Sequence, residues 1–258
     1  MVNRVFDRIP EFDEQSRNYP VRALLAAAQP VTRFWDIDVW LDQGSEGACV
    51  GFAWGHDIAA EPAVGPVDNG YARFIYHEAR FIDEWVGEDY EGTSVLAGAK
   101  VMTRLGWISE YRWAFSTDDV LATLGSLGPV ILGVNWYSDM FDTDANGYVH
   151  VSGQLLGGHA ILITGVDFEN SRVQLHNSWG QSWGQNGKAW LSFSDLDRLL
   201  HEQGEGCIPL VRNQVVIDPI DPIEPVDPIE PEPEPEPAGD NWFTRFLNWL
   251  WSLLTGKP

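Results

Sequence analysis

Proline recurs at every third and then every second residue between positions 217 and 237, in the stretch IDPIDPIEPVDPIEPEPEPEP. Proline at this density removes backbone donors and fixes φ, which blocks both helix and sheet. A packed fold in this 258-residue chain must therefore lie outside that stretch. The composition divides the chain into an N-terminal extension (1–30), a folded domain (31–213), an acidic proline-rich linker (214–240) and a C-terminal segment (241–258).

The linker has a regular apolar edge. Polyproline II has three residues per turn, so one edge would carry only apolar side chains and another the acids. A stiff, self-repelling spacer is the simpler interpretation, and a docking strip is the alternative. The apolar positions are Ile217, Ile220, Ile223, Val226 and Ile229.

The C-terminal segment, DNWFTRFLNWLWSLLTGKP, predicts an amphipathic, tryptophan-rich helix. Placed on a helix, Arg245, Asn248, Ser252 and Thr255 form one narrow polar stripe, and apolar residues cover most of the remainder. Residues 242–254 would span about 20 Å, which is too short for a bilayer core. Binding to a partner protein, self-association, a membrane interface and packing back onto the domain all remain open.

The charge balance excludes several classes of partner. The chain has 16 Lys and Arg against 38 Asp and Glu, a formal net charge of −22. Phosphate contacts need cations, so nucleic acid is not an expected partner. The first residues contain no apolar run typical of a secretory signal, and no stretch is long enough to span a membrane. The sequence therefore predicts a cytoplasmic protein.

The order of patterns along residues 31–213 predicts an α+β fold. Apolar spacing predicts helices over residues 71–85 and 94–105. Short apolar runs broken by Gly and Asn then predict strands. These runs are PVILGVNWY, GYVHVSG, HAILITGVDF, RVQLHNSWG and KAWLSF.

Cys49 is a candidate nucleophile. It follows Gly44 and Gly47 and opens a helical pattern, so it would lie at the positive end of a helix, which favours the thiolate. A nucleophilic cysteine needs a base, and the base needs an orienting group. His159, which follows two glycines, and Asn177, at the end of a strand-like run, fit these roles. No cluster of cysteine and histidine has metal-ligand spacing, so neither a metal nor another cofactor is predicted.

Three segments together resemble the papain family of cysteine peptidases. They contain Gln43 to Cys49, Gly158-His159-Ala160, and the string from Asn177 to Gly187 that reads NSWGQSWGQNG. The resemblance covers about residues 35–195 and implies a two-lobed fold, with a helical N-terminal lobe, an antiparallel β-rich C-terminal lobe and the active site between them. It also implies a Cys49-His159-Asn177 triad, an oxyanion hole at Gln43, a shielding role for Trp179, and a peptide or protein substrate.

The sequence departs from the family at several positions. Val50 follows the nucleophile where the family has Trp, and Glu46 stands where the family has a disulfide cysteine. Only 48 residues precede Cys49, which are too few for the full propeptide of the family. In this respect the sequence resembles bacterial or bacteriophage versions of the family. Three possibilities follow for the control of activity without a full propeptide. The enzyme is synthesised in an active form, residues 1–30 cover its active site, or another protein restrains it. Two further functions stay open: a catalytically silent papain-fold binding protein, and an amidase or acyltransferase acting on cell-wall peptides.

Overall fold

The structure, a computed structural model, describes residues 4–25, 31–83 and 91–210. The predicted linker (214–240) and C-terminal helix (241–258) lie outside these described residues. Among the helices that are described, none has the length and apolarity needed to cross a membrane.

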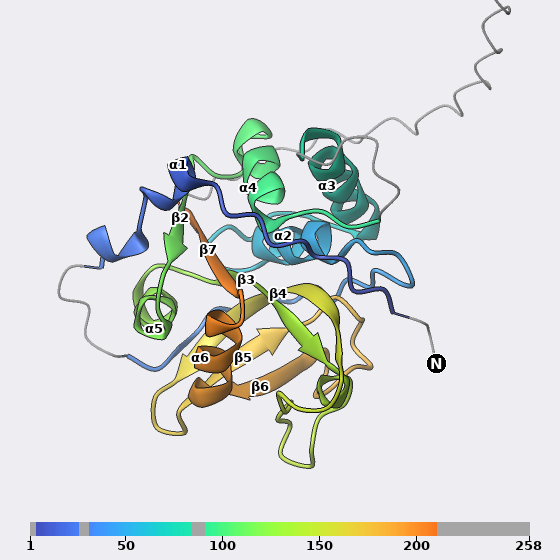
Figure 1. The fold of residues 1–258 in the computed structure, drawn as a ribbon, viewed down its shortest axis with the longest axis vertical. Coiled ribbons are helices and arrows are strands. Elements are labelled where there is room, and N and C mark those ends of the chain that lie inside the picture. Colours follow the sequence, from blue (N-terminus) through green and yellow to red (C-terminus); the bar gives the residue numbers. More distant parts are fainter. Residues whose placement is uncertain (1–3, 26–30, 84–90, 211–258) are drawn as a thin grey trace, which may run out of the picture. The chain divides into compact units, whose positions relative to one another are not determined.

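Three helices form one lobe, α2 (Cys49–Ala59), α3 (Asn69–Ile82) and α4 (Val95–Arg104). The side chain of Asp68 caps α3 by accepting from the Tyr71 N–H at 2.8 Å. Ser94 caps α4 in the same way, accepting from the Ala97 N–H at 2.9 Å. Every residue of α2 is buried, because α3 and α4 cover it on one side and the sheet on the other (Figure 1). The two predicted helices are confirmed, with slightly different ends.

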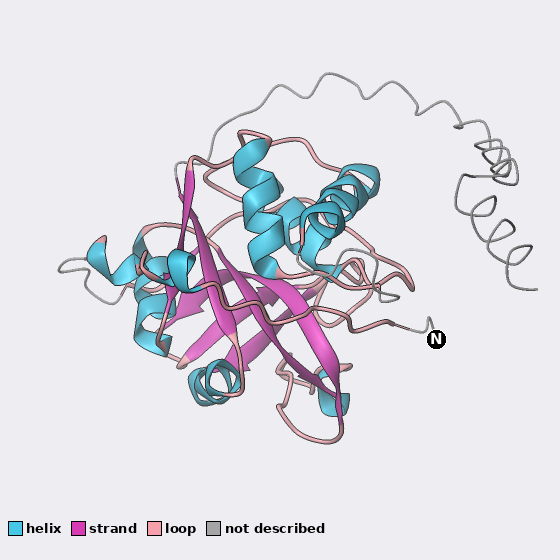
Figure 2. Ribbon diagram, turned by 45° about the horizontal axis from the view of Figure 1, so that its top comes forward, coloured by secondary structure: helices cyan, strands magenta, loops and turns pink. Residues whose placement is uncertain are grey.

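An antiparallel sheet forms the other lobe, with strand order β2-β7-β3-β4-β5-β6 and β1 paired to β4. Figure 2 shows this sheet in magenta beside the helical lobe. The arrangement confirms the predicted α+β, two-lobed architecture. The strands are β1 (Arg33–Phe34), β2 (Glu110–Ala114), β3 (Val130–Tyr137), β4 (Leu155–Asp167), β5 (Arg172–His176), β6 (Lys188–Ser192) and β7 (Glu205–Leu210).

Shorter elements and two further helices pack around the sheet. They are α1 (Glu14–Arg17), η1 (Val21–Ala23), α5 (Thr117–Ser126), η2 (Ser138–Met140) and α6 (Phe193–His201). The main apolar core lies between the sheet, α5 and α6. Helices and strands are less segregated along the chain than predicted, because β2 precedes α5 and the last strand, β7, inserts between β2 and β3.

The predicted strand at residues 147–153 is wrong. This segment forms a turn and loop in which Tyr148 makes only an isolated bridge to Trp190. The carboxylate of Asp144 accepts from the N–H groups of Asn146 and Tyr148, both at 2.9 Å, and these bonds replace a ladder. A second difference concerns β4, which begins at Leu155, so that His159 lies within the strand and not at its start.

Residues 4–12, here called the N-terminal strap, run across the molecule between the two lobes (Figure 1, dark blue). The strap forms parallel bridges to both sides, from Asp7 to Gly158 in β4 and from Arg8 to Thr93 just before α4. The predicted N-terminal extension is therefore packed into the domain over its described part.

Candidate active site

Cys49 is the first residue of α2, and its side chain is completely buried. The preceding residue, Ala48, provides no side-chain cap, so the backbone N–H groups of the first turn remain directed toward the region around the sulfur. The backbone groups of Ala160 and Val50 lower the pKa of the Cys49 thiol, against the larger effect of burial. Ala160 is the β4 residue that follows His159, so the sulfur lies beside this strand.

His159 and Asn177 are joined by a hydrogen bond of 2.9 Å between Nε2 and Oδ1. The same Oδ1 accepts from the Ser178 N–H at 2.8 Å, which fixes the orientation of the amide. Because Oδ1 can only accept, Nε2 of His159 must carry the proton. Nδ1 then has a lone pair, and within the described part of the chain it has no hydrogen-bond partner. The imidazole is therefore held in the tautomer that can accept a proton from a thiol.

Burial keeps the Cys49 thiol and the His159 imidazole neutral in this arrangement. Desolvation raises the pKa of Cys49 to about 11, and the nearby carboxylate of Asp7 acts in the same direction. Desolvation lowers the pKa of His159 to about 4, against the hydrogen bond to Asn177. A thiolate–imidazolium pair would be solvated much better if water reached the site.

Aromatic rings enclose the His159 imidazole. The ring centroid of Trp179, the residue for which a shielding role is predicted, lies 5.2 Å from that of His159. Trp136 of β3 is closer, at 4.7 Å in an edge-to-face arrangement, and the ring of Phe6 from the strap lies at 5.9 Å. Trp136 is not among the residues predicted from the sequence, although its run PVILGVNWY pairs with the strand that contains His159.

Gln43 is buried beside the same residues. Its Oε1 accepts from the Ser178 hydroxyl at 2.6 Å, and its Nε2 donates to the Glu46 carbonyl at 2.8 Å. An amide nitrogen has two N–H donors, and the bond to Glu46 uses one of them. The Asp7 carboxylate lies against Gly47 in this loop, where a side chain at Gly47 would collide with it.

The other five histidines make contacts away from Cys49. His56 accepts from the Leu41 N–H at 3.1 Å and packs edge-to-face against His176, with ring centroids 4.4 Å apart. The remaining three lie near carboxylates on the surface, namely His77 by Glu46, His150 by Asp144 and His201 by Asp197.

The strap occupies the space over these residues. The Arg8 N–H donates to the Gly158 carbonyl at 2.9 Å, and the Ile9 N–H donates to the Thr93 carbonyl at 3.0 Å. Side chains at Gly92 and Gly158 would collide with the strap backbone, so glycine permits this close approach. An extended peptide is thus already bound between the two lobes.

Two arginine side chains fix the strap. Arg4 donates to the Asp42 carboxylate at 2.6 Å and to the Gly44 carbonyl at 2.7 Å. Arg8 forms a buried ion pair with Glu205 at 2.8 Å. None of these contacts was predicted, because each partner lies far away in the sequence.

Comparison with known proteins finds similarity over part of the chain. Residues 96–195 match the model of the papain family of cysteine proteases, a range that includes His159 and Asn177 and begins after Cys49. The cathepsin B-like cysteine proteinase 4 of Caenorhabditis elegans is 42% identical over 79 residues, which are 30% of this chain and 24% of that protein. The gut-specific cysteine proteinase of the same organism is 33% identical over 82 residues, 31% of this chain and 25% of that protein. The chain thus spans about a quarter of the length of these curated relatives.

Solved structures show the same fold. Xylellain, a cysteine protease from Xylella fastidiosa, superposes with a TM-score of 0.64 at 22% identity, covering 82% of this chain and 98% of that one. The digestive procathepsin L2 proteinase of Tenebrio molitor gives a TM-score of 0.55 at 15% identity, covering 81% and 78%. At these identities the likeness to the two proteases shows a shared fold.

Proposed function

We propose that this chain is a papain-type cysteine peptidase that hydrolyses peptide bonds through Cys49, His159 and Asn177. The observation that carries the proposal is the 2.9 Å bond from His159 Nε2 to Asn177, which leaves Nδ1 available on the strand that contacts Cys49. A base held in one tautomer beside a thiol at a helix N-terminus is the arrangement that thiol nucleophiles need.

The residues divide the reaction into two steps. His159 Nδ1 takes the proton of Cys49, and the sulfur attacks the substrate carbonyl carbon. The carbonyl oxygen becomes an oxyanion that accepts from the Cys49 backbone N–H and from the unused N–H of Gln43. The imidazolium then gives its proton to the leaving amine, and a C–N bond breaks. Water, deprotonated by His159, cleaves the thioester and releases the acid.

We further propose that the strap restrains this activity until it leaves. Asp7 lies at the Gly47 loop, and Phe6 packs on His159 with ring centroids 5.9 Å apart. A peptide substrate needs the same backbone groups at Thr93 and Gly158 that now accept from the strap. The sequence leaves open an enzyme made in an active form, a cover formed by residues 1–30, and restraint by another protein. These contacts favour the cover formed by residues 1–30.

The test of the proposed function uses an epoxide thiol trap and a general peptide library on the full chain. Cys49→Ala should abolish both labelling and cleavage, while Cys207→Ala, which removes a buried thiol of β7, should retain both. Arg8→Ala, which loosens the strap, should accelerate both. A folded chain that is neither labelled nor active, even with Arg8→Ala, would be a silent binding protein. Cleavage of cell-wall fragments but not of peptides would favour the amidase or acyltransferase function.

We also propose that residues 241–258 attach the enzyme to a partner protein, to a second copy or to a membrane interface. The support is the sequence pattern, with Trp and Leu on all but one narrow stripe. A chain truncated after residue 213 should retain peptidase chemistry and lose sedimentation with membranes or oligomers. Identical behaviour of the two chains in both assays contradicts this role.

A further inference from the structure

Helix α3 holds the loop that precedes α2, here called the 42–47 loop. The side-chain oxygen of Asn69 accepts from the Asp42 N–H at 2.9 Å. One turn further along α3, Nε of Arg73 donates to Oε2 of Glu46 at 3.0 Å. Because Asn69 and Arg73 are four residues apart, they share one face of the helix. This face therefore holds the loop near both of its ends.

Gln43 lies between these two contacts and is linked to the second of them. Its Nε2 donates to the Glu46 carbonyl at 2.8 Å, so the residue that pairs with Arg73 also orients the Gln43 amide. The Arg73 guanidinium lies over the ring of Phe52 in α2, 5.5 Å from its centroid, which limits where it can go. One residue, Glu46, thus connects Arg73 to Gln43.

The helix that holds the loop also packs directly on the helix that begins with Cys49. A Cβ at Gly51 of α2 would collide with the Ala72 carbonyl oxygen and with the Tyr76 side chain. The backbone of α3 therefore approaches α2 as closely as a glycine permits. In the proposed mechanism the oxyanion accepts from the Cys49 backbone N–H and from the Gln43 amide. Both donors are fixed to the same frame, the α2–α3 pair.

The strap holds the same loop from the other side, but only while it is in place. Arg4 donates to the Asp42 carboxylate and to the Gly44 carbonyl. Asp7 lies against Gly47. In the proposed mechanism the substrate enters after the strap leaves, so these contacts are lost in the working enzyme. The contacts from α3 do not involve the strap and remain.

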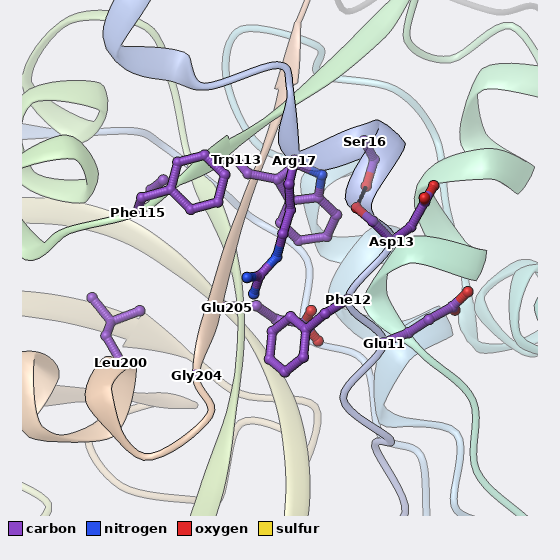
Figure 3. A pocket seen from close by; sticks show the side chains of 11 residues that line it. Glu11, Phe12, Asp13, Ser16, Arg17, Trp113, Phe115, Leu200, Gly204 and Glu205 are labelled. Carbon is purple, nitrogen blue, oxygen red and sulfur yellow. Dashed lines mark hydrogen bonds between the residues drawn. The ribbon is translucent and has the colours of Figure 1, made fainter.

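The far end of the strap lies at a separate place. Figure 3 shows Phe12 and Arg17 at a cavity of about 220 Å³, and the Arg17 guanidinium lies 4.1 Å from the Phe12 ring centroid. The residues that line this cavity do not include any of the 42–47 loop. A change at Phe12 therefore loosens the strap without removing a contact of the loop.

We propose that Asn69 and Arg73 are positioning residues that keep the Gln43 amide in the oxyanion site once the strap has left. This inference rests on the proposed peptidase function. The oxyanion exists only after the sulfur has attacked, so the effect of these residues belongs to kcat and not to KM. The Ser178 hydroxyl still donates to Oε1 of Gln43, so loss of the α3 contacts weakens the site without removing it.

A simpler interpretation is that Asn69 and Arg73 only stabilise the fold. General loosening would slow every reaction of Cys49, whereas misplacement of Gln43 slows only reactions that form an oxyanion. Iodoacetamide separates the two interpretations. The sulfur attacks its CH₂ carbon, an S–C bond forms, and the C–I bond breaks to release iodide, so no carbonyl oxygen becomes charged.

The experiment uses the full chain with Asn69→Ala and Arg73→Met combined. The kcat for peptide cleavage should fall by about 10-fold, a part of the roughly 10²–10³ that removal of a whole oxyanion donor costs. The KM and the rate of Cys49 alkylation by iodoacetamide should stay within about twofold of the wild type. Arg104→Met, the matched control, removes an arginine that pairs with Glu78 on the same helix and should leave kcat unchanged. Phe12→Ala should alter KM alone, because the strap competes with the substrate.

Dependence on Gln43 is the readout that a structural role would not move. In Gln43→Ala, the same double change should lower kcat by no more than about twofold further, because no amide remains to be positioned. Arg73→Lys keeps a cation for Glu46 and should recover at least half of the loss caused by Arg73→Met. If the double variant does not fold, Glu46→Gln serves instead. It weakens the ion pair, retains the backbone carbonyl and should lower kcat by about threefold.

The possible outcomes separate this proposal from the peptidase function. Three results each overturn the proposal: an unchanged kcat in the variant, an equal fall in the alkylation rate, or the same fractional loss of kcat in Gln43→Ala as in the wild type. An active wild-type chain with any of these results loses only the positioning role. A wild-type chain that is alkylated at Cys49 but cleaves no peptide overturns the peptidase function, and the positioning role with it.

Discussion

Asn177 holds His159 through Oδ1 and Nε2 at 2.9 Å, while the Ser178 N–H holds Asn177 through the same oxygen at 2.8 Å. One backbone amide thus fixes a side-chain amide, which in turn fixes the imidazole. Because the lone pair of Nδ1 is directed by this chain of bonds, the capacity of His159 to take a proton depends on Asn177.

Replacement of Asn177 should therefore reduce activity without unfolding the chain. We expect Asn177→Ala to lower kcat/KM by roughly 100-fold, because the imidazole loses its tautomer and orientation. Asn177→Asp keeps an acceptor for His159 and should recover part of the loss. Asn146→Ala, in an exposed turn, is the matched control and should leave kcat/KM unchanged. Equal activity of Asn177→Ala and the wild type would remove Asn177 from the mechanism.

Removal of the Phe6 ring should open the site. Phe6 packs on His159, Trp136, Trp179 and Phe141 in a nearly continuous aromatic contact. Burial of a Phe side chain contributes about 1.5–3 kcal/mol, so Phe6→Ala should raise the epoxide labelling rate of Cys49 by at least about tenfold. Phe81→Ala removes a ring that is 79% exposed and should not alter the rate. Unchanged labelling with Phe6→Ala would show that the strap does not limit access.

The Asp7 carboxylate should make the thiol less acidic. Its negative charge raises the pKa of Cys49, in addition to the larger effect of desolvation. Asp7→Asn should therefore move the midpoint of the labelling-rate profile to lower pH. This midpoint distinguishes an electrostatic effect from simple loosening of the strap, which raises the rate at every pH. Asp142→Asn, on an exposed loop, should leave the midpoint in place.

The sequence predicted the parts of the site whose signals are local. A cysteine at the start of a helical pattern and the string after Asn177 are each contained within a dozen residues. The predicted strand at residues 147–153 has suitable alternation, but alternation cannot reveal that the pairing stops at one bridge, from Tyr148 to Trp190. The strap was not predictable in detail, because the partners of Arg8 lie 85 to 197 positions further along the chain, at Thr93 and Glu205.

Three buried histidines should make the fold sensitive to acid. Desolvation lowers the pKa of His159 to about 4, of His176 to about 3, and of His56 well below 6.5. Below pH 6.5, the ordinary value, the unfolded chain binds more protons at these sites than the folded chain. Their stability contribution is therefore present above that pH and is lost as the pH falls. Glu205 acts in the opposite direction, because burial raises its pKa from 4.5 to about 7 and the folded chain then binds the extra proton.

Between pH 8 and pH 5, the three histidines lower the free energy of unfolding by more than Glu205 raises it. His159 and His176 each lose about 2 kcal/mol between pH 8 and pH 5, and Glu205 restores about 2 to 3 kcal/mol. The net loss from these three groups is about 1 to 2 kcal/mol, and His56 adds to the loss in the same direction. Urea unfolding of full-length Cys49→Ala, which prevents self-cleavage, measures this loss directly. His176→Gln keeps a donor for the Val39 carbonyl and should reduce the slope by about one proton per molecule. His77→Gln, at an exposed site, should leave the slope unchanged. A free energy of unfolding that stays constant from pH 8 to pH 5 would contradict neutral burial of these rings.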